Sequence, residues 1–211
     1  MSASLPACRA LLGCALAGAV MSVMTRSGPM SVPEQLLGVR VDNAAAAGMF
    51  TLEVERLATA HKLSARPAGP SDQDLAQAWN GGLAFSGALE LGLAGGSKAT
   101  VDVMGTMSLQ DLRAAINAES ARTGVVANVL AVSATDHRLV LTASATGKAI
   151  ELADAGGDSL TGLLGATEVQ PARTARILVD GVAVEHSDNQ FQDVLPGIAI
   201  DAYRAEPGSV V

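Results

Sequence analysis

The stretch Ser108-Leu-Gln-Asp-Leu-Arg-Ala-Ala-Ile-Asn117 decides the fold of this chain, because it combines a helix start, an apolar stripe and an Ile-Asn pair. Ser108 is a favourable N-cap, and Asp111 three residues later can complete a capping box with it. Leu109, Leu112 and Ile116 recur at helical spacing and should face one side. We therefore predict an amphipathic helix that starts at Ser108 and packs through these three apolar residues.

Paired strands are predicted on both sides of this helix. Residues 89–93 and 99–104 flank a loop of hairpin size, and residues 138–142 should pair with residues 125–132. Because residues 125–132 are apolar on both faces, we expect a central strand there. Gly124 is expected to end the helix. This order predicts an α+β fold, mostly β, with antiparallel sheets and hairpins and one main amphipathic helix packed on a sheet face.

The segment before these elements predicts a bent strand followed by a loop. Residues 50–54 alternate apolar and polar side chains, and a bulge near Glu55 explains why the alternation then shifts. The strand is expected to continue to Leu63. Residues 64–82 are rich in Ser, Ala, Pro, Gly and Asp, so we expect a loop. Trp79 is expected to anchor this loop to the body of the protein.

The last third of the chain predicts a short helix, a hairpin and a final strand. Residues 160–164 have the pattern of a short helix. Residues 175–184 indicate a hairpin, because Asp180-Gly181 supplies a type I′ turn. Asp193-Val-Leu-Pro-Gly197 is typical of a turn, and a strand is expected over residues 198–203.

Composition excludes several classes of function. Apolar residues make up 49% of the chain but aromatic residues only 2%, so neither an aromatic-lined ligand pocket nor a platform for stacking bases is expected. The net charge of -7, without a basic patch, argues against a nucleic-acid partner and against an anionic membrane surface. Both cysteines, Cys8 and Cys14, precede the folded part, which therefore has no disulfide or cysteine metal site.

The polar residues form no constellation for catalysis or cofactor binding. The histidines His61, His137 and His186 have no partner at zinc-ligand spacing, and His137 is expected to be a solvated turn residue. Asp154 and Asp158 form only an incomplete calcium loop. Gly95-Gly-Ser-Lys98 lacks the spacing of a phosphate loop, and His186-Ser-Asp188 places triad residue types too close in sequence for triad geometry. We expect no enzyme activity, no cofactor, no metal and no small-molecule substrate.

Residues 1–37 form an atypical N-terminal segment. Residues 10–24 are small and apolar, which fits the core of a signal peptide and is short for a membrane span. Three interpretations stay open: a secretory or lipoprotein signal, an apolar helix or disordered end, and a displaced coding start.

Three segments in this order resemble the bacterial flagellar filament-cap family, also called hook-associated protein 2. The first holds an Ala-Gly turn and a Leu-Ala-x-Ala-x-Lys-Leu pattern, the second is the flagellin hook IN motif, and the third holds an Asp-Gly hairpin and an Asp-Val-x-x-Gly turn. They are Val41 to Leu63, Leu109 to Asn117 with its flanking strands, and Arg176 to Ile198. Ala205-Glu-Pro-Gly208 also fits, and the resemblance covers roughly residues 38–211.

The resemblance implies a domain organisation. Residues 38–84 and 170–211 would form a first β-rich head domain, and residues 85–169 an inserted IN-motif domain. The N-terminal helix and the C-terminal coiled-coil half of the family are not matched, so we expect a truncated form. The structural motif is expected to rest on ten residues: Ser108, Leu109, Asp111, Leu112, Ile116, Asn117, Asp180, Gly181, Asp193 and Gly197.

The resemblance also implies a function. Members of that family form an oligomeric cap at the growing filament tip, help exported flagellin to fold into place, and can contact host surfaces such as mucin. An extracellular structural component of the flagellum is therefore expected. Its partners would be flagellin, other axial proteins, further copies of itself and a host surface glycoprotein. The alternative is a secreted or lipid-anchored adhesion-type β domain with residues 1–26 as its signal.

Overall fold

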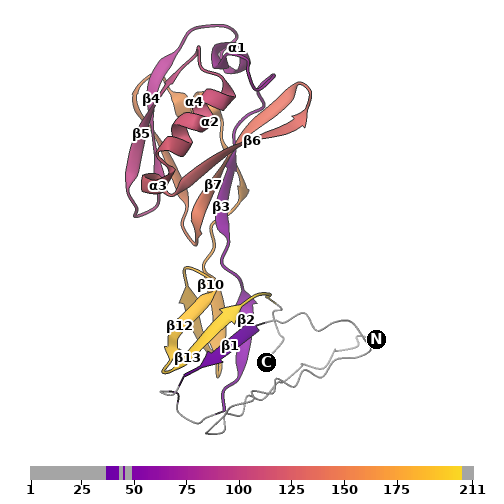
Figure 1. The fold of residues 1–211 in the computed structure, drawn as a ribbon, viewed down its shortest axis with the longest axis vertical. Helices are drawn as coiled ribbons and strands as arrows, with labels where there is room; N and C mark the ends of the chain where they lie inside the picture. Colours follow the sequence, from indigo (N-terminus) through magenta and orange to yellow (C-terminus); the bar gives the residue numbers. More distant parts are fainter. Residues whose placement is uncertain (1–36, 43–44, 46–48, 206–211) are drawn as a thin grey trace. The chain divides into compact units, whose positions relative to one another are not determined.

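The computed structural model describes residues 37–42, 45 and 49–205, which form two compact units (Figure 1). Unit 1 consists of the described residues up to Ala58 together with those from Thr174 onward, and unit 2 is Thr59–Arg173. Boundaries at 84/85 and 169/170 were expected from the sequence. Residues 59–84 belong to unit 2 because the strand near their start pairs only with strands of that unit.

Unit 1 contains two three-stranded antiparallel sheets, ordered β1-β13-β12 and β11-β10-β2. The strands are β1 Leu37–Val41, β2 Leu52–Arg56, β10 Ala175–Val179, β11 Val182–His186, β12 Gln190–Leu195 and β13 Ile198–Ala202. Alternating residues of both sheets point into a common core, in which Phe191, Ile177 and Ile200 are almost fully buried. The N-terminal strands β1 and β2 pair with the C-terminal strands β13 and β10, so this core joins residues that are far apart in the sequence.

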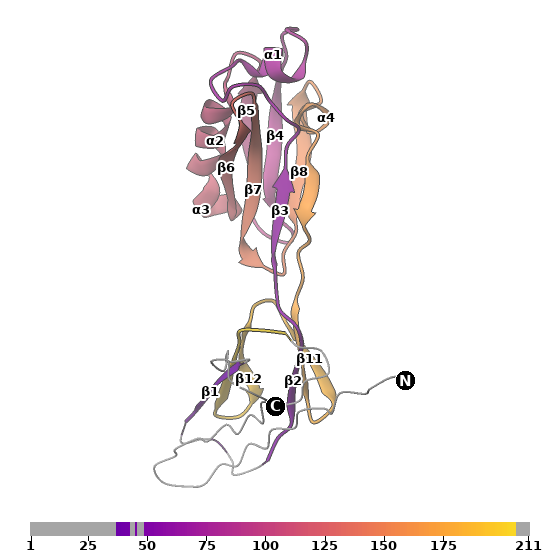
Figure 2. The same ribbon diagram turned by 90° about the vertical axis from the view of Figure 1, so that its right-hand side faces the viewer.

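Unit 2 contains a four-stranded sheet, β6-β7-β3-β9, and a three-stranded sheet, β5-β4-β8. Its strands are β3 Ala60–Ser64, β4 Ser86–Leu93, β5 Lys98–Met104, β6 Val125–Ser133, β7 Asp136–Thr146, β8 Ile150–Gly157 and β9 Thr167–Gln170. Its helices are α1 Leu75–Trp79, α2 Leu109–Ala118, α3 Ser120–Thr123 and α4 Leu160–Leu164. Figure 2 shows α2 lying along β6 of the four-stranded sheet.

The observed fold confirms the predicted class, an α+β protein that is mostly β with antiparallel sheets. The hairpin β4–β5, the pairing of β6 with β7 and the short helix α4 are all present as expected. A bulge at Glu55 is also present, because Val54 and Arg56 face the consecutive residues Ile177 and Arg176 of β10. Trp79 is buried in the core of unit 2, as expected for an anchor.

Four expectations about individual elements were wrong. β6 is an edge strand rather than a central one, because it lies at the end of the sheet order β6-β7-β3-β9. Its residues Leu130 and Val132 lie exposed. Gly124 was expected to end the main helix, but α2 ends at Ala118 and Gly124 ends the separate helix α3. The chain does not run as one strand to Leu63, because β2 ends at Arg56 and β3 begins a new sheet at Ala60. Residues 64–82 are not loop throughout, since α1 starts at Leu75.

Four strands were missed: β1, β8, β9 and most of β12. Asp154 to Asp158 were expected to form a polar loop, but Asp154 to Gly157 are the exposed second half of β8. Asp193 was expected in a turn but lies within β12, and the turn to β13 narrows to Pro196 and Gly197.

Residues 1–36 and 206–211 lie outside the described part, and so do the interpretations of the N-terminal segment and of Ala205 to Gly208 beyond its first residue. Within the described part, no helix has the length and apolar character that a membrane crossing requires.

Candidate functional site

The start of α2 is held by the capping box that the sequence predicts. The backbone N–H of Asp111 donates to Ser108 Oγ at 3.2 Å, and the backbone N–H of Ser108 donates to Asp111 Oδ2 at 3.0 Å. The hydroxyl of Ser108 also donates to Asp111 Oδ2 at 2.7 Å. These hydrogen bonds from Ser108, the backbone one foremost, lower the pKa of the Asp111 carboxyl. Two backbone donors at the helix start are thereby satisfied, which fixes where α2 begins.

The apolar stripe of α2 is fully buried. Leu109, Leu112 and Ile116 all face the core of unit 2, where they meet residues of both sheets such as Leu91 and Val125. Burying three large aliphatic side chains stabilises the unit by several kcal/mol, at about 1.5–3 kcal/mol for each. The apolar stripe is therefore the part of α2 that packs the helix against the sheets.

Asn117, one of the expected motif residues, connects α2 to the sheet by hydrogen bonds. Its side-chain amide pairs with both backbone groups of Ala127 on β6: Nδ2 donates to the carbonyl at 2.9 Å, and Oδ1 accepts from the N–H at 2.8 Å. The amide thus imitates the backbone of a neighbouring strand. The only sequence signal for this contact is that Asn117 directly follows Ile116. Ile116 faces the core, and Asn117 reaches the edge of the sheet.

Asp180 and Gly181 form the predicted turn between β10 and β11. Their φ angles, 49° and 81°, are both positive, as a type I′ turn requires. Asp180 also contacts the chain just before β2, because its Oδ1 accepts from the backbone N–H of Thr51 at 2.8 Å and its own N–H donates to the Thr51 carbonyl at 2.9 Å. The turn is therefore tied to the neighbouring strand. Gly197, with φ of 73°, makes the turn between β12 and β13.

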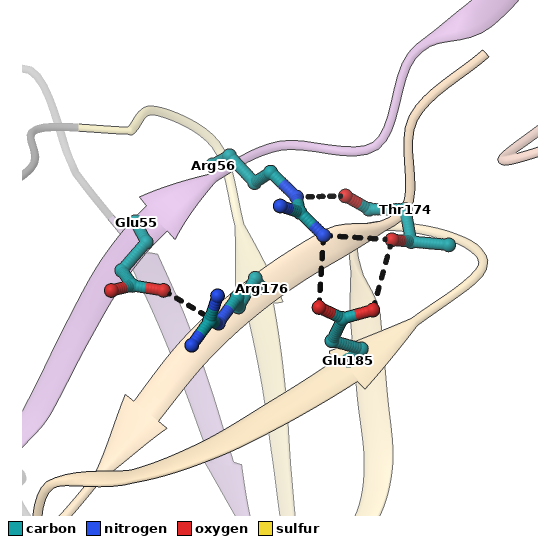
Figure 3. Close-up of polar contacts among 5 residues, drawn as sticks. All are labelled: Glu55, Arg56, Thr174, Arg176 and Glu185. Carbon is teal, nitrogen blue, oxygen red and sulfur yellow. Dashed lines mark hydrogen bonds and ion pairs between the residues drawn. The ribbon is translucent and has the colours of Figure 1, made fainter.

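A cluster of charged side chains surrounds the bulge in β2 (Figure 3). Arg56 donates through Nε to the carbonyl of Thr174 at 3.0 Å and through Nη2 to Glu185 Oε1 at 2.9 Å. The neighbouring Glu55 forms an ion pair with Arg176 at 2.7 Å. The bulge sets both residues opposite one position of β10, so each can reach a different partner. These half-exposed pairs position strands and contribute little to stability.

The histidine side chains serve the fold. His61 is buried in unit 2, with Nε2 at 3.0 Å from Glu168 Oε2 and Nδ1 accepting from the backbone N–H of Ile150 at 2.9 Å. His137 is not a solvated turn residue, because it lies in β7 with Nδ1 at 3.2 Å from the carbonyl of Gly69. In unit 1, Nδ1 of His186 at the end of β11 lies 2.9 Å from Oδ1 of the exposed Asp188.

The two acidic residues weighed as calcium ligands instead cap backbone segments. Asp154 accepts from the backbone N–H and the hydroxyl of Thr161, both at 2.8 Å, and from the Ser159 hydroxyl at 2.9 Å. These hydrogen bonds lower the pKa of the Asp154 carboxyl, the Thr161 backbone bond most. Asp158 accepts from the backbone N–H of Ser86 at 2.9 Å. Among the described residues, no group of three or more His, Cys, Asp or Glu side chains could hold a metal ion.

An open cleft of about 520 Å³ lies in unit 2, at the ends of α1, β4 and β5. Its polar lining includes Asp74, Gln77, Thr106 and Asp158, and its apolar lining includes Phe85. The described residues that line it include no histidine, cysteine or lysine. The arrangement of the described residues is that of a scaffold with capped helices and closed turns.

Comparison with known proteins agrees with this architecture. The flagellin hook IN motif matches residues 89–145, which run from β4 to β7 around α2. The chain is 31% identical over 163 residues to the flagellar hook-associated protein 2 of Escherichia coli O157:H7, a match that covers 71% of this chain and 33% of the relative. The chain therefore spans about a third of the length of that relative.

Two crystal structures extend the likeness to three dimensions. The D2-D3 domains of the flagellar cap protein FliD from Escherichia coli match with a TM-score of 0.71 and 26% identity, over 84% of this chain and 92% of that one. The corresponding domains from Serratia marcescens share the fold, with a TM-score of 0.69 and 24% identity over 82% and 95% of the two chains. With the IN motif in unit 2 and both units matched, this chain is similar to the D2-D3 domains of the flagellar cap protein, also called hook-associated protein 2.

Proposed function

We propose that this protein is a structural component of the bacterial flagellum that caps the filament tip and assists flagellin assembly. The observation that carries the proposal is the match of both units together to the D2-D3 domains of the Escherichia coli cap protein, over 92% of that chain. A shared single motif would be weaker support, because a module can be reused in proteins of different function.

The described residues suit such a role through rigidity. The capping box at Ser108, the buried stripe of α2 and the amide of Asn117 hold one helix on one sheet edge at several points. The Asp180 turn does the same for unit 1 by joining a hairpin to the neighbouring strand. A subunit that guides other proteins by its shape needs side chains in fixed positions and needs no reactive group. We propose that these motif residues serve assembly by keeping the two units rigid.

The proposed partners follow from the proposed role. They are flagellin and other axial proteins of the flagellum, together with further copies of this chain in the cap, and the proposed location is extracellular. No enzyme activity is proposed, since the relatives named above are cap proteins. An adhesive contact with a host glycoprotein would be a second use of the same exposed surface, and no described residue favours it over assembly.

A chimera tests the proposal directly. Residues 37–205 of this chain replace the matched region of the cap protein in Escherichia coli, and swimming in soft agar and filament formation are measured. We expect filaments and swimming well above those of the strain in which that region is deleted.

Two controls make the result interpretable. A chimera that carries Leu112→Asp, which places a charge in the core of unit 2, should lose function, whereas Gln110→Ala, at a half-exposed position outside the buried stripe of α2, should not. The proposal is overturned if the unaltered chimera is exported in normal amounts and the cells still form no filaments.

A further inference from the structure

The turn that follows α1 holds the only Asn-Gly pair in the chain. Asn80 is followed by Gly81, whereas every other asparagine of the sequence precedes alanine, valine or glutamine. The backbone N–H of Leu83 donates to the carbonyl of Asn80 at 3.0 Å and closes a β-turn. Gly81 and Gly82 both have positive φ angles, 60° and 84°, as a type I′ turn requires. The pair therefore lies where the chain reverses after the helix.

The groups that would react at this pair are accessible. Gly81 is exposed and Asn80 is half-exposed. Among the described residues, no hydrogen bond engages the backbone N–H of Gly81. A Cβ atom built on Gly81 would meet no atom within 4 Å, so no side chain packs against the glycine there. The side-chain amide of Asn80 has a single bond in the described structure, from Nδ2 to the carbonyl of Leu83 at 2.9 Å.

We propose that Asn80 is a site of spontaneous deamidation whose products open the turn after α1. The backbone nitrogen of Gly81 attacks Cγ of Asn80 and loses its proton, the bond from Cγ to Nδ2 breaks, and ammonia leaves. The product is a succinimide ring. Water then opens either carbonyl of the ring and gives aspartate or isoaspartate at this position. Glycine favours the attack because it has no side chain to hinder the approach of its nitrogen.

Either product weakens the turn. In the aspartate form, a carboxylate oxygen stands in place of Nδ2 and faces the carbonyl oxygen of Leu83, so a hydrogen bond is replaced by repulsion. In the isoaspartate form, the main chain runs through Cβ and Cγ. The carbonyl that accepts from the N–H of Leu83 then becomes a free carboxylate outside the main chain. Both forms also add a negative charge at the C-terminal end of α1, where the helix dipole disfavours it.

The turn helps to hold α1 in place. The backbone N–H groups of Asn80 and Gly82 both donate to the carbonyl of Ala76, at 3.0 and 2.8 Å. Trp79, directly before the pair, is 7% exposed and packs in the core of unit 2. Its indole Nε1 is buried without a hydrogen-bond partner among the described residues, so packing alone holds the ring. Opening of the turn should therefore loosen α1 and give solvent access to Trp79.

The modification also changes the surface of unit 2. Gly82 and Ala84 line the open cleft at the ends of α1, β4 and β5, which already carries the carboxylates of Asp74 and Asp158. A further carboxylate in the adjacent turn makes this side of unit 2 more acidic. Because the reaction needs only the Asn-Gly pair and water, the inference does not depend on the proposed cap function.

Peptide mapping of the full chain tests the site. Trypsin cleaves after lysine and arginine except before proline, so Asn80, Asn117 and Asn128 fall in separate peptides, each as the only asparagine. These peptides are residues 63–98, 114–122 and 123–138. The folded protein is kept at mildly alkaline pH, which promotes loss of the Gly81 proton, and samples are compared with fresh protein by mass spectrometry. We expect the mass increase of deamidation in the first peptide to grow several-fold faster than in the other two.

The other two peptides are internal controls. The amide of Asn117 is held at both ends by the backbone of Ala127, so the fold protects it. Asn128 is exposed on β6 like a surface residue, but it precedes Val129, whose branched side chain hinders the attack. A rate at Asn80 no higher than that at Asn128 overturns the proposed site.

Two variants test the chemistry of the pair. Gly81→Ala finds room for its methyl group, although its positive φ angle is strained, and it should slow the deamidation several-fold. Asn80→Gln keeps a neutral amide but can form only a larger, less favourable ring, so it should abolish the reaction and keeps the test decisive if Gly81→Ala unfolds. An undiminished mass increase in the Asn80→Gln variant would place the modification elsewhere in the peptide and overturn the proposal.

Fluorescence tests the consequence for α1. Ion-exchange chromatography separates the modified protein by its additional negative charge, and quenching of Trp79 by acrylamide is measured. We expect stronger quenching and faster hydrogen exchange in α1 than in the unmodified protein. Gln77→Glu is the matched control, because it adds the same charge at an exposed position of α1 outside the turn and should leave Trp79 protected. Equal quenching of the modified and unmodified proteins overturns the loosening of α1.

Discussion

The two units close their β-rich cores in different ways. Unit 2 is one continuous segment, and its ends meet: the N–H of Thr59 donates to the carbonyl of Arg173 at 2.9 Å, and the reverse bond is 3.3 Å long. Unit 1 joins two segments separated by all of unit 2, and β2 pairs with β10 across that gap. Long-range pairing is slow and entropically costly to form. Unit 2 should therefore fold by itself, whereas unit 1 needs unit 2 to bring its segments together.

The two units also differ in helix content. Unit 2 has its main sheet covered by α2, while every described element of unit 1 is a strand. Trp79, the only tryptophan in the chain, lies in the core of unit 2. Its fluorescence can therefore follow unit 2, and hydrogen exchange of the strand amides can follow unit 1.

The largest expected effect comes from removing a core side chain of α2. Leu112→Ala should lower the free energy of unfolding of unit 2 by about 2–5 kcal/mol, because Leu112 is fully buried and leaves a cavity. The measurement is urea unfolding followed by the fluorescence of Trp79. The matched change in unit 1, Ile177→Ala, should leave that transition in place and speed hydrogen exchange in β10. Loss of the fluorescence transition on Ile177→Ala would mean that unit 2 does not fold by itself.

Asn117 provides the next test, because it distinguishes a helix held by packing alone from one also held by hydrogen bonds. Asn117→Ala leaves both backbone groups of Ala127 without their protein partner and should cost unit 2 about 1–3 kcal/mol. Faster hydrogen exchange of the Ala127 amide would locate the effect. Gln110→Ala on the same helix is the control and should change stability by less than about 0.5 kcal/mol. If the two substitutions changed the stability of unit 2 equally, the hydrogen bonds of Asn117 would not contribute to holding α2 on the sheet.

The turn of β10 and β11 offers a smaller test in unit 1. Gly181→Ala should destabilise that unit by about 1–2 kcal/mol, because a side chain at φ of 81° is strained. Asp180→Asn should be nearly neutral, since asparagine tolerates positive φ and keeps an oxygen for the N–H of Thr51. Hydrogen exchange in β10 and β11 reports both. A large effect of Asp180→Asn would show that the charge, rather than the turn geometry, holds the hairpin.

Local signals explain what could be predicted from the sequence. The start of α2, its buried stripe and the Asp180-Gly181 turn each depend on residues within ten positions of one another, and all three are present. The bulge at Glu55 was also predictable, because it changes the alternation of a single strand.

Features that depend on distant partners could not be predicted. The apolar residues of β6 suggested a central strand, but the amide of Asn117 rather than a further strand bonds its outer edge at Ala127, and sequence patterns do not indicate such a contact. The strand β8 was not predicted, because its small and acidic residues form a strand only by pairing with β4. The boundary at Thr59 depends on a bond to Arg173, more than a hundred residues away.

Acid should destabilise unit 2 through its capping carboxylates, which is the smallest effect we expect. The pKa values of Asp154 and Asp111 lie below the ordinary 3.8, because both carboxylates accept backbone hydrogen bonds. A carboxyl whose pKa is lower in the folded state adds stability above its unfolded pKa and loses it as the pH falls through the folded value. The fluorescence melting temperature should therefore decline only below about pH 4. Asp154→Asn should flatten this decline without abolishing it, because Asp111 continues to titrate at the start of α2. An identical acid profile for the variant and the parent would show that the cap on α4 does not contribute to the stability of unit 2.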